Sequence, residues 1–193
     1  ADVSRAHMII PPVPMEWLYH KLLSPEPYYS RSLTLLIWIG ALIGLLRRLW
    51  YRPGRVRVLD RPLVALDLET TGLSPRYGDR VVEIGLVRAE DGVETVFQSL
   101  VNPRYPISPG SMAVHGITQE MVECAPTFGE LAERIWPMLA GATLVAHNAP
   151  FDLAFLNPER GALGLPPLRN RFIDTLALAR RYFQFPRNGL GVI

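Results

Sequence analysis

From Arg61 onward, the chain alternates between short apolar runs and segments of helical periodicity, and this alternation limits the folds that it can form. Three strand-like runs come first, and two pairs of turn residues, Gly78-Asp79 and Asp91-Gly92, separate them. Short runs of this kind joined by tight turns are typical of antiparallel hairpins. The sequence therefore predicts a three-stranded antiparallel meander over residues 63–68, 80–89 and 94–101.

Helical and strand-like segments alternate after the meander. Thr127 and Glu130 have the spacing of a helix capping box, and apolar residues follow at helical intervals. Residues 143–146 form a fourth strand-like run, and Pro150 stands where the first turn of a helix tolerates proline. Strand and helix then repeat through residues 172–182. A meander followed by alternating elements predicts an α/β fold with a mixed sheet.

Composition divides the chain into four parts. Residues 1–30 are rich in proline and are predicted to be irregular. Residues 31–50 are predicted to form a hydrophobic helix, residues 51–58 an arginine-rich linker, and residues 59–193 the globular domain.

The run from Leu33 to Leu46 contains no charged residue and has the composition of a membrane segment. As a helix it would rise only ~21 Å, at ~1.5 Å per residue, against a hydrocarbon core of ~30 Å. Arginines are concentrated on its C-terminal side, which is typical of the cytoplasmic side of a membrane. Two interpretations remain: a short spanning or interfacial anchor that holds a cytoplasmic domain at the inner face of the cell membrane, or a helix buried against protein.

The formal net charge of +2 means that any binding to nucleic acid must depend on local patches. Cys124 is the only cysteine, which excludes an internal disulfide and a multi-cysteine zinc site. It fits a reducing compartment, and we expect its side chain to be buried as a small apolar group.

Three acidic residues stand at positions suited to metal chemistry. Asp67 and Glu69 close the first strand, and residues two apart on a strand project from the same face. Clustered carboxylates are the ligands that Mg²⁺ prefers. The polar turn Thr70-Thr71-Gly72 follows, with hydroxyls and amides that could hold a phosphate or a sugar. A third acid, Asp152, lies in the first turn of the helix that leaves the fourth strand.

Four motifs occur in order: VALDLETTGL, VHGIT, LVAHNAPFDLAFL and DTLALAR. Together they resemble the DEDD-type exonucleases of the DnaQ-like group, with the epsilon proofreading subunit of bacterial DNA polymerase III as the nearest likeness. The resemblance implies an RNase H-like fold in which Asp67, Glu69 and Asp152 hold two divalent ions, Mg²⁺ or Mn²⁺. It also implies that nucleotides are released from the 3′ ends of DNA, or of RNA, and that a DNA polymerase subunit is a partner.

The resemblance further implies the residues that contact the substrate. They lie in the turn after the first strand, in the VHGIT motif and around the third acid: Thr70, Thr71, Gly72, Leu73, Val114, His115, Asn148 and Phe151. It assigns structural roles to His147, which supports its loop, and to Asp174, which ends a strand.

The family completes its site with a histidine and a fourth acid beyond the DTLALAR motif, and this sequence ends at Ile193. We expect the sequence to be a fragment of a longer product. The alternative is a shortened relative that binds nucleic acid or a polymerase without cutting.

Overall fold

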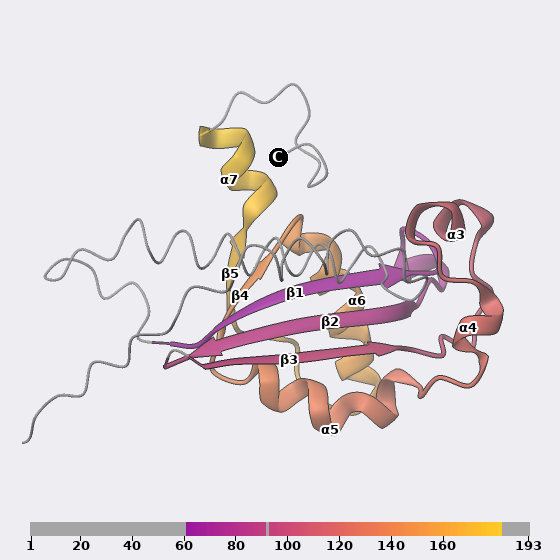
Figure 1. Cartoon of the computed structure of the whole chain (residues 1–193), viewed down its shortest axis with the longest axis horizontal. Coiled ribbons are helices and arrows are strands. Elements are labelled where there is room, and N and C mark those ends of the chain that lie inside the picture. The colour runs from indigo at the N-terminus through magenta and orange to yellow at the C-terminus, as the bar shows by residue number, and fades with distance from the viewer. Residues whose placement is uncertain (1–60, 92, 183–193) are drawn as a thin grey trace, which may run out of the picture.

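The computed structural model describes residues 61–91 and 93–182, and these form a five-stranded mixed sheet flanked by helices (Figure 1). The strand order is β3-β2-β1-β4-β5. Strands β1, β2 and β3 are antiparallel neighbours, whereas β4 and β5 run parallel to β1. The strands are β1 (Leu63–Thr70), β2 (Val81–Glu90), β3 (Val93–Leu100), β4 (Thr143–Ala146) and β5 (Arg171–Asp174).

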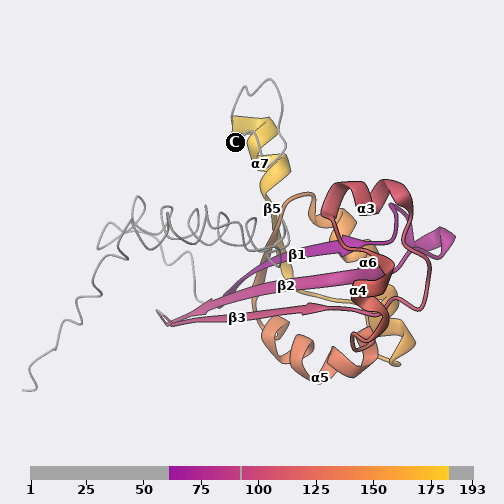
Figure 2. The same ribbon diagram turned by 45° about the vertical axis from the view of Figure 1, so that its right-hand side comes forward.

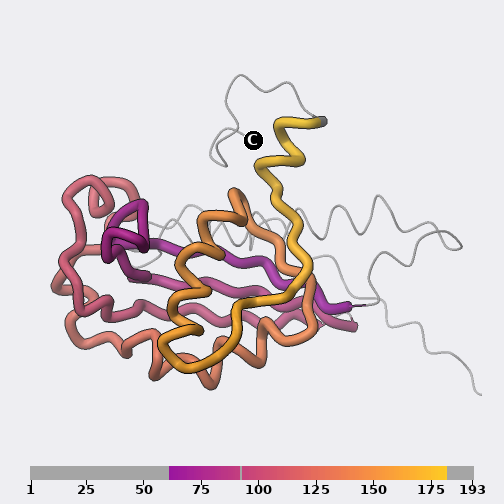
Figure 3. The backbone as a smooth tube through the Cα atoms, turned by 180° about the vertical axis from the view of Figure 1, so that it is seen from behind, coloured from indigo at the N-terminus to yellow at the C-terminus, as the bar shows by residue number. Residues whose placement is uncertain are grey.

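One 3-10 helix and five α-helices connect and cover the strands within the described residues. They are η1 (Pro75–Tyr77), α3 (Pro109–His115), α4 (Gln119–Glu123), α5 (Phe128–Leu139), α6 (Ala149–Ala162) and α7 (Thr175–Tyr182). Helices α3 and α4 lie beyond the end of the sheet at which β1 ends (Figures 1 and 2). The path from β4 through α6 to β5 is followed most easily from behind (Figure 3).

Helices α5 and α6 pack on one face of the sheet and form the main core with it. The side chains of Leu66 and Leu68 on β1 point into this core, where they meet Ile135 of α5 and Leu156 of α6. Each fully buried side chain of this size contributes about 1.5–3 kcal/mol. Because side chains alternate along a strand, Asp67 and Glu69 project from the opposite face. The core therefore fixes the direction of both acids.

The predicted meander, the alternating elements after it and the mixed-sheet α/β fold are confirmed. Strand β1 continues two residues beyond its predicted end, to Thr70, because it pairs with β2 up to that residue. The predicted capping box is present, with the Thr127 amide donating to the Glu130 carboxylate at 2.7 Å.

Two features differ from the prediction. Helix α3 was not predicted, although Ser108 caps it and Pro109 occupies its first position. Cys124 was predicted to be buried and is exposed. It ends α4, where Val122 takes the inward position, so the cysteine side chain is left in solvent.

The predictions for residues 1–30, 31–50 and 51–58, including the run from Leu33 to Leu46, lie outside the described residues. Within the part of the chain that the structure describes, no helix has the length and apolar character needed to cross a membrane.

Candidate active site

The face of the sheet opposite α5 and α6 carries a row of acidic side chains on β1 and β2. Asp67 pairs in register with Gly85, and Glu69 pairs with Glu83. Residues directly opposite one another in an antiparallel pair have side chains on the same face. Glu69 and Glu83 are therefore neighbours, while Gly85 leaves the space beside Asp67 without an opposing side chain.

Asp152 of helix α6 lies within electrostatic range of these acids. Asn148 precedes the helix with a left-handed backbone (φ 72°), a conformation that asparagine adopts more readily than most residues. The backbone amide of Asn148 donates to Asp174 Oδ1 at 3.1 Å, which ties the start of α6 to the end of β5. Asp152 lies in the first helical turn and is only 4% exposed.

The charges of the three predicted acids act on one another. Burial raises the pKa of Asp67 to about 8, and the charges of Glu69, Asp152 and Glu83 add to the rise. Burial also raises the pKa of Asp152 to about 8, with contributions from Asp174 and Glu69. A carboxyl group in such surroundings is stabilised as an anion by a nearby cation or by hydrogen-bond donors.

Asp67 Oδ2 is inaccessible to solvent and has no hydrogen-bond partner among the described residues. A buried carboxylate oxygen without a partner costs several kcal/mol unless a proton or a cation satisfies it. In residues 61–91 and 93–182, no three His, Cys, Asp or Glu side chains are gathered closely enough to hold a metal ion. The charges of the acids thus influence one another, although their side chains do not converge on a single point.

The turn after β1 is organised around Asp79. Its Oδ1 accepts from the Thr71 hydroxyl at 3.0 Å, and its Oδ2 accepts from the Ser74 amide at 2.9 Å. The Thr70 hydroxyl donates to the Gly72 carbonyl at 2.6 Å. Thr71 has no exposed surface and Thr70 is buried, so among the four predicted contact residues of this turn only Gly72 and Leu73 are accessible to a ligand.

Replacing Gly72 with alanine should destabilise the protein by about 1–3 kcal/mol, the usual cost of forcing extra volume into a packed site. A Cβ atom at Gly72 would collide with the Asp79 carboxylate, which two hydrogen bonds hold in place. Urea unfolding measures the change. Gly161→Ala in α6 is the matched control, since the added carbon would meet no atom within 4 Å beyond its own stretch of helix. A Gly72→Ala protein as stable as the control would contradict the packing argument.

The remaining predicted contact residues fall into two groups. Leu73 and Val114 are large apolar side chains that are 84% and 64% exposed, beside the end of β1 and at the end of α3. Phe151 is half-buried and packs on Phe155, with ring centroids 5.0 Å apart. Leu73 and Val114 therefore present apolar surface to solvent, and Phe151 mainly supports α6.

His115 is buried, and both of its ring nitrogens are in use. The Ile117 amide donates to Nδ1 at 3.0 Å, and Nε2 lies 3.2 Å from the Thr70 carbonyl oxygen. Burial lowers the pKa of His115, which favours the neutral ring. A neutral ring with its proton on Nε2 satisfies both contacts and ties the end of β1 to the loop after α3.

His147 and Asp174 have the structural contacts that the resemblance implies. His147 Nδ1 lies 3.1 Å from the Thr175 hydroxyl. Asp174 ends β5 and accepts from the amides of Leu176 and Ala177 at the start of α7, at 2.9 and 3.3 Å.

Glu83 and Asp79 were not predicted from the sequence. Glu83 is 2% exposed, lies opposite Glu69 and accepts from Gln98 Nε2 at 2.7 Å. The sequence pattern could have indicated Glu83, because it is a charged residue within an otherwise apolar run of strand residues. Asp79 could not be distinguished from an ordinary turn residue.

A mixed sheet in this strand order, with carboxylates at the end of its central strand and on the helix that follows β4, defines an RNase H-like nuclease fold. The family model described as Exonuclease matches residues 64–192, and the chain belongs to this family.

Similar proteins include bacterial proteins named after the epsilon subunit of DNA polymerase III. The chain is 43% identical over 140 residues to the DNA polymerase III subunit epsilon-like protein of Rhodobacter capsulatus, covering 68% of this chain and 20% of that protein. It is 36% identical over 136 residues to the DNA polymerase III subunit epsilon of Rickettsia prowazekii, covering 67% and 59%. The chain thus spans less than two thirds of the length of either relative.

Among solved structures, exonuclease X in complex with 5′ overhanging duplex DNA is 34% identical, with a TM-score of 0.50 over 67% of this chain and 69% of that chain. Product-bound exonuclease I is 19% identical, with a TM-score of 0.56 over 62% and 31%. The second likeness bears on the fold alone.

Proposed function

We propose that the chain carries a 3′-to-5′ exonuclease domain that hydrolyses the terminal phosphodiester of DNA and acts with a DNA polymerase. The observation that carries the proposal is the coupled set Asp67, Glu69 and Asp152, with a buried Asp67 oxygen that lacks a partner among the described residues. This set is costly for a folded protein, and its cost is removed by binding cations.

The residues present fit hard divalent cations, Mg²⁺ or Mn²⁺, because the available donors are carboxylate oxygens. Two such ions, when bound, supply a nucleophilic hydroxide and stabilise the charge on the leaving oxygen. Asp67, Glu69 and Asp152 would hold them.

The terminal nucleotide would lie against the turn after β1 and the end of α3. Gly72 allows the backbone to approach closely, and the exposed side chains of Leu73 and Val114 offer apolar contact to a base. Three further residues would fix the positions of β1 and α6 rather than make extensive contacts with the substrate: His115, Asn148 and Phe151. Nothing in these contacts selects deoxyribose, so RNA is the alternative substrate.

The first experiment measures shortening of a 5′-labelled single-stranded DNA oligomer with Mg²⁺, with an RNA oligomer of the same sequence in parallel. The 193-residue chain is compared with the full-length product of its natural open reading frame, whatever the length of that product. A ladder that shortens from the 3′ end supports the proposal, and the faster oligomer identifies the sugar preference. An oligomer that stays intact with the full-length protein would overturn it.

A second candidate is a module that binds nucleic acid or a polymerase without cutting. It is favoured by the two described histidines, since both His115 and His147 make structural contacts and neither stands ready as a general base. Binding of the intact oligomer in a gel-shift assay, without shortening, would select this candidate.

A further inference from the structure

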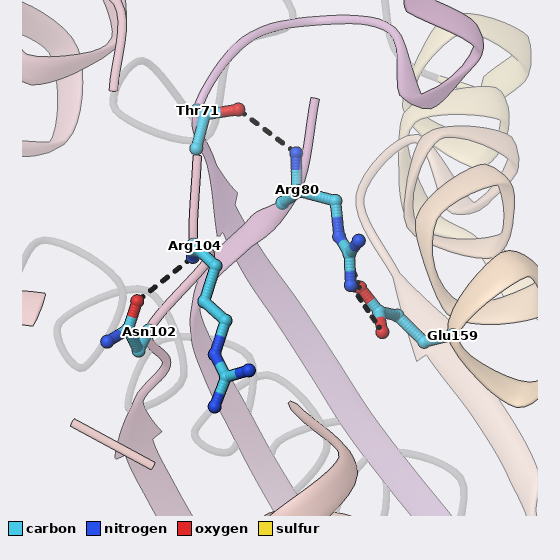
Figure 4. A network of polar contacts seen from close by, with 5 residues as sticks. All are labelled: Thr71, Arg80, Asn102, Arg104 and Glu159. Atoms are coloured by element: carbon cyan, nitrogen blue, oxygen red, sulfur yellow. Dashed lines mark hydrogen bonds and ion pairs between the residues drawn. The ribbon is translucent and has the colours of Figure 1, made fainter. Parts of the chain in front are cut away.

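Arg80, the residue before β2, joins two parts of the chain that carry predicted acids (Figure 4). Its backbone holds the turn after β1: its amide donates to the Thr71 hydroxyl at 3.0 Å, and its carbonyl accepts from the Thr71 amide at 2.9 Å. Its side chain reaches in the other direction, to Glu159 of α6. One residue therefore connects the turn that follows Asp67 and Glu69 to the helix that carries Asp152.

The contact between Arg80 and Glu159 is bidentate. Arg80 Nε donates to Glu159 Oε1 at 3.0 Å, and Nη2 donates to Oε2 at 3.1 Å. Two parallel hydrogen bonds of this kind fix the angle as well as the distance between the partners. The pair thus constrains both the position of α6 and its rotation about its own axis.

The burial of Glu159 makes the contact hard to replace. The Glu159 side chain is 9% exposed, whereas the Arg80 side chain is 47% exposed. Burial raises the pKa of Glu159, and the Arg80 charge and hydrogen bonds oppose the rise. Buried ion pairs are weak sources of net stability, yet removal of one partner is costly, so their best-attested use is to specify an arrangement.

Helix geometry relates Glu159 to Asp152. The two residues are seven apart, about two turns, so they lie on nearly the same face of α6 and about 10.5 Å apart along its axis. Helix α6 also packs against η1, in the segment that leads to Arg80. A shift of α6 at Glu159 would therefore move Asp152 relative to the acids of β1.

We infer that Arg80 and Glu159 form a positioning pair that sets the separation between Asp152 and the carboxylates of Asp67 and Glu69, and so controls the affinity of the site for divalent cations. The inference rests on the proposed function. Neither residue is one of the proposed cation ligands, so both would act through Asp152.

Arg88 provides a matched control on the same strand. It lies toward the other end of β2, and its Nη1 donates to the carbonyls of Met138 and Ala140 at the end of α5, at 2.7 and 3.1 Å. It also pairs with Glu90 at 2.9 Å. Arg88 is thus an arginine that holds a strand to a helix, as Arg80 does, but its helix carries none of the predicted acids.

The experiment compares Arg80→Gln, Arg80→Lys, Glu159→Gln and Arg88→Gln in the full-length protein. Mn²⁺ affinity is measured by calorimetry, protection of residues 149–156 by hydrogen exchange, and kcat and KM on the DNA oligomer. We expect Arg80→Gln and Glu159→Gln to weaken Mn²⁺ binding at least 10-fold, to speed exchange at the start of α6 and to lower kcat with little change in KM. Arg80→Lys, which keeps the charge without the bidentate geometry, should give an intermediate result.

Arg88→Gln should lower the thermal midpoint and leave Mn²⁺ affinity and α6 exchange as in the wild type. If the wild type binds Mn²⁺ and the three Arg80 and Glu159 variants bind it equally well, the positioning pair is overturned while the proposed function stands. If the wild type binds no Mn²⁺ and does not shorten the oligomer, the proposed function fails, and the pair fails with it. The Arg80→Lys protein keeps the test informative if the glutamine variants do not fold.

Discussion

Replacing Asp67 with asparagine is expected to reduce nucleotide release at least 1,000-fold while the protein stays folded. Asn is nearly the same size, so the packing of β1 is kept, but the carboxylate that would hold a divalent cation is lost. Metal ions in such sites contribute several kcal/mol of transition-state stabilisation, and a 1,000-fold loss corresponds to ~4 kcal/mol. The measurement is the rate of oligomer shortening by the full-length protein at saturating Mg²⁺.

The control for this substitution is Asp91→Asn. Asp91 is an exposed acid in the turn between β2 and β3, and its left-handed backbone (φ 47°) suits asparagine. Asp91→Asn makes the same chemical change away from the candidate site, and this variant should shorten the oligomer at the wild-type rate. An Asp67→Asn protein that retains activity within 10-fold of this control would remove Asp67 from the catalytic centre.

Asp67→Asn should also be more stable than the wild type in the absence of metal. Asp67 is a half-buried carboxylate near three other acids, and its Oδ2 atom is inaccessible to solvent and has no partner among the described residues. An amide in its place carries no charge to desolvate. We expect the thermal midpoint of Asp67→Asn in EDTA to be higher than that of the wild type, and we expect Mn²⁺ to raise it by less than it raises the wild-type midpoint. These two results would show that the wild-type acid is kept for binding rather than for folding.

The strands and the main acids could be predicted because their signals are local. Short apolar runs bounded by turn residues identified β1 and β2, and the spacing of Asp67 and Glu69 placed both on one face of a strand. The capping box of α5 was equally visible, since Thr127 and Glu130 are three residues apart. Helix α3 had a similar signal in Ser108-Pro109, but it is only seven residues long and carries no apolar periodicity of its own.

The residues that hold the site together could not be predicted, because their partners are far away along the chain. Arg80 and Glu159 are separated by 79 positions, and His115 and Thr70 by 45. Thr71 shows the same limit in reverse. Its hydroxyl looked available for a phosphate, yet the folding of the turn around Asp79 buries it completely. Which polar groups face a ligand depends on the tertiary packing of the turn.

The metal-free protein should gain stability as the pH falls from 8 to 6.5, in contrast to most paired carboxylates. Asp67 and Asp152 ionise near 3.8 in an unfolded chain, whereas in the folded protein the pKa of each is raised to about 8. Between these values the folded state keeps protons that the unfolded state has released. Each group therefore removes stability as the pH rises through this window, at up to ~1.4 kcal/mol per pH unit.

Urea unfolding in EDTA at pH 8.0, 7.25 and 6.5 measures the effect, and we expect the free energy of unfolding to rise by about 1–3 kcal/mol over this range. The window ends at 6.5 because burial lowers the pKa of His115, so that residue destabilises the fold at lower pH. Saturating Mn²⁺ should remove the dependence, since a cation favours the ionised acids. The double variant Asp67→Asn, Asp152→Asn should also lose it. A wild-type protein whose midpoint is constant in EDTA would mean that the two acids are already compensated in the folded protein, and the need for cations would no longer follow from their burial.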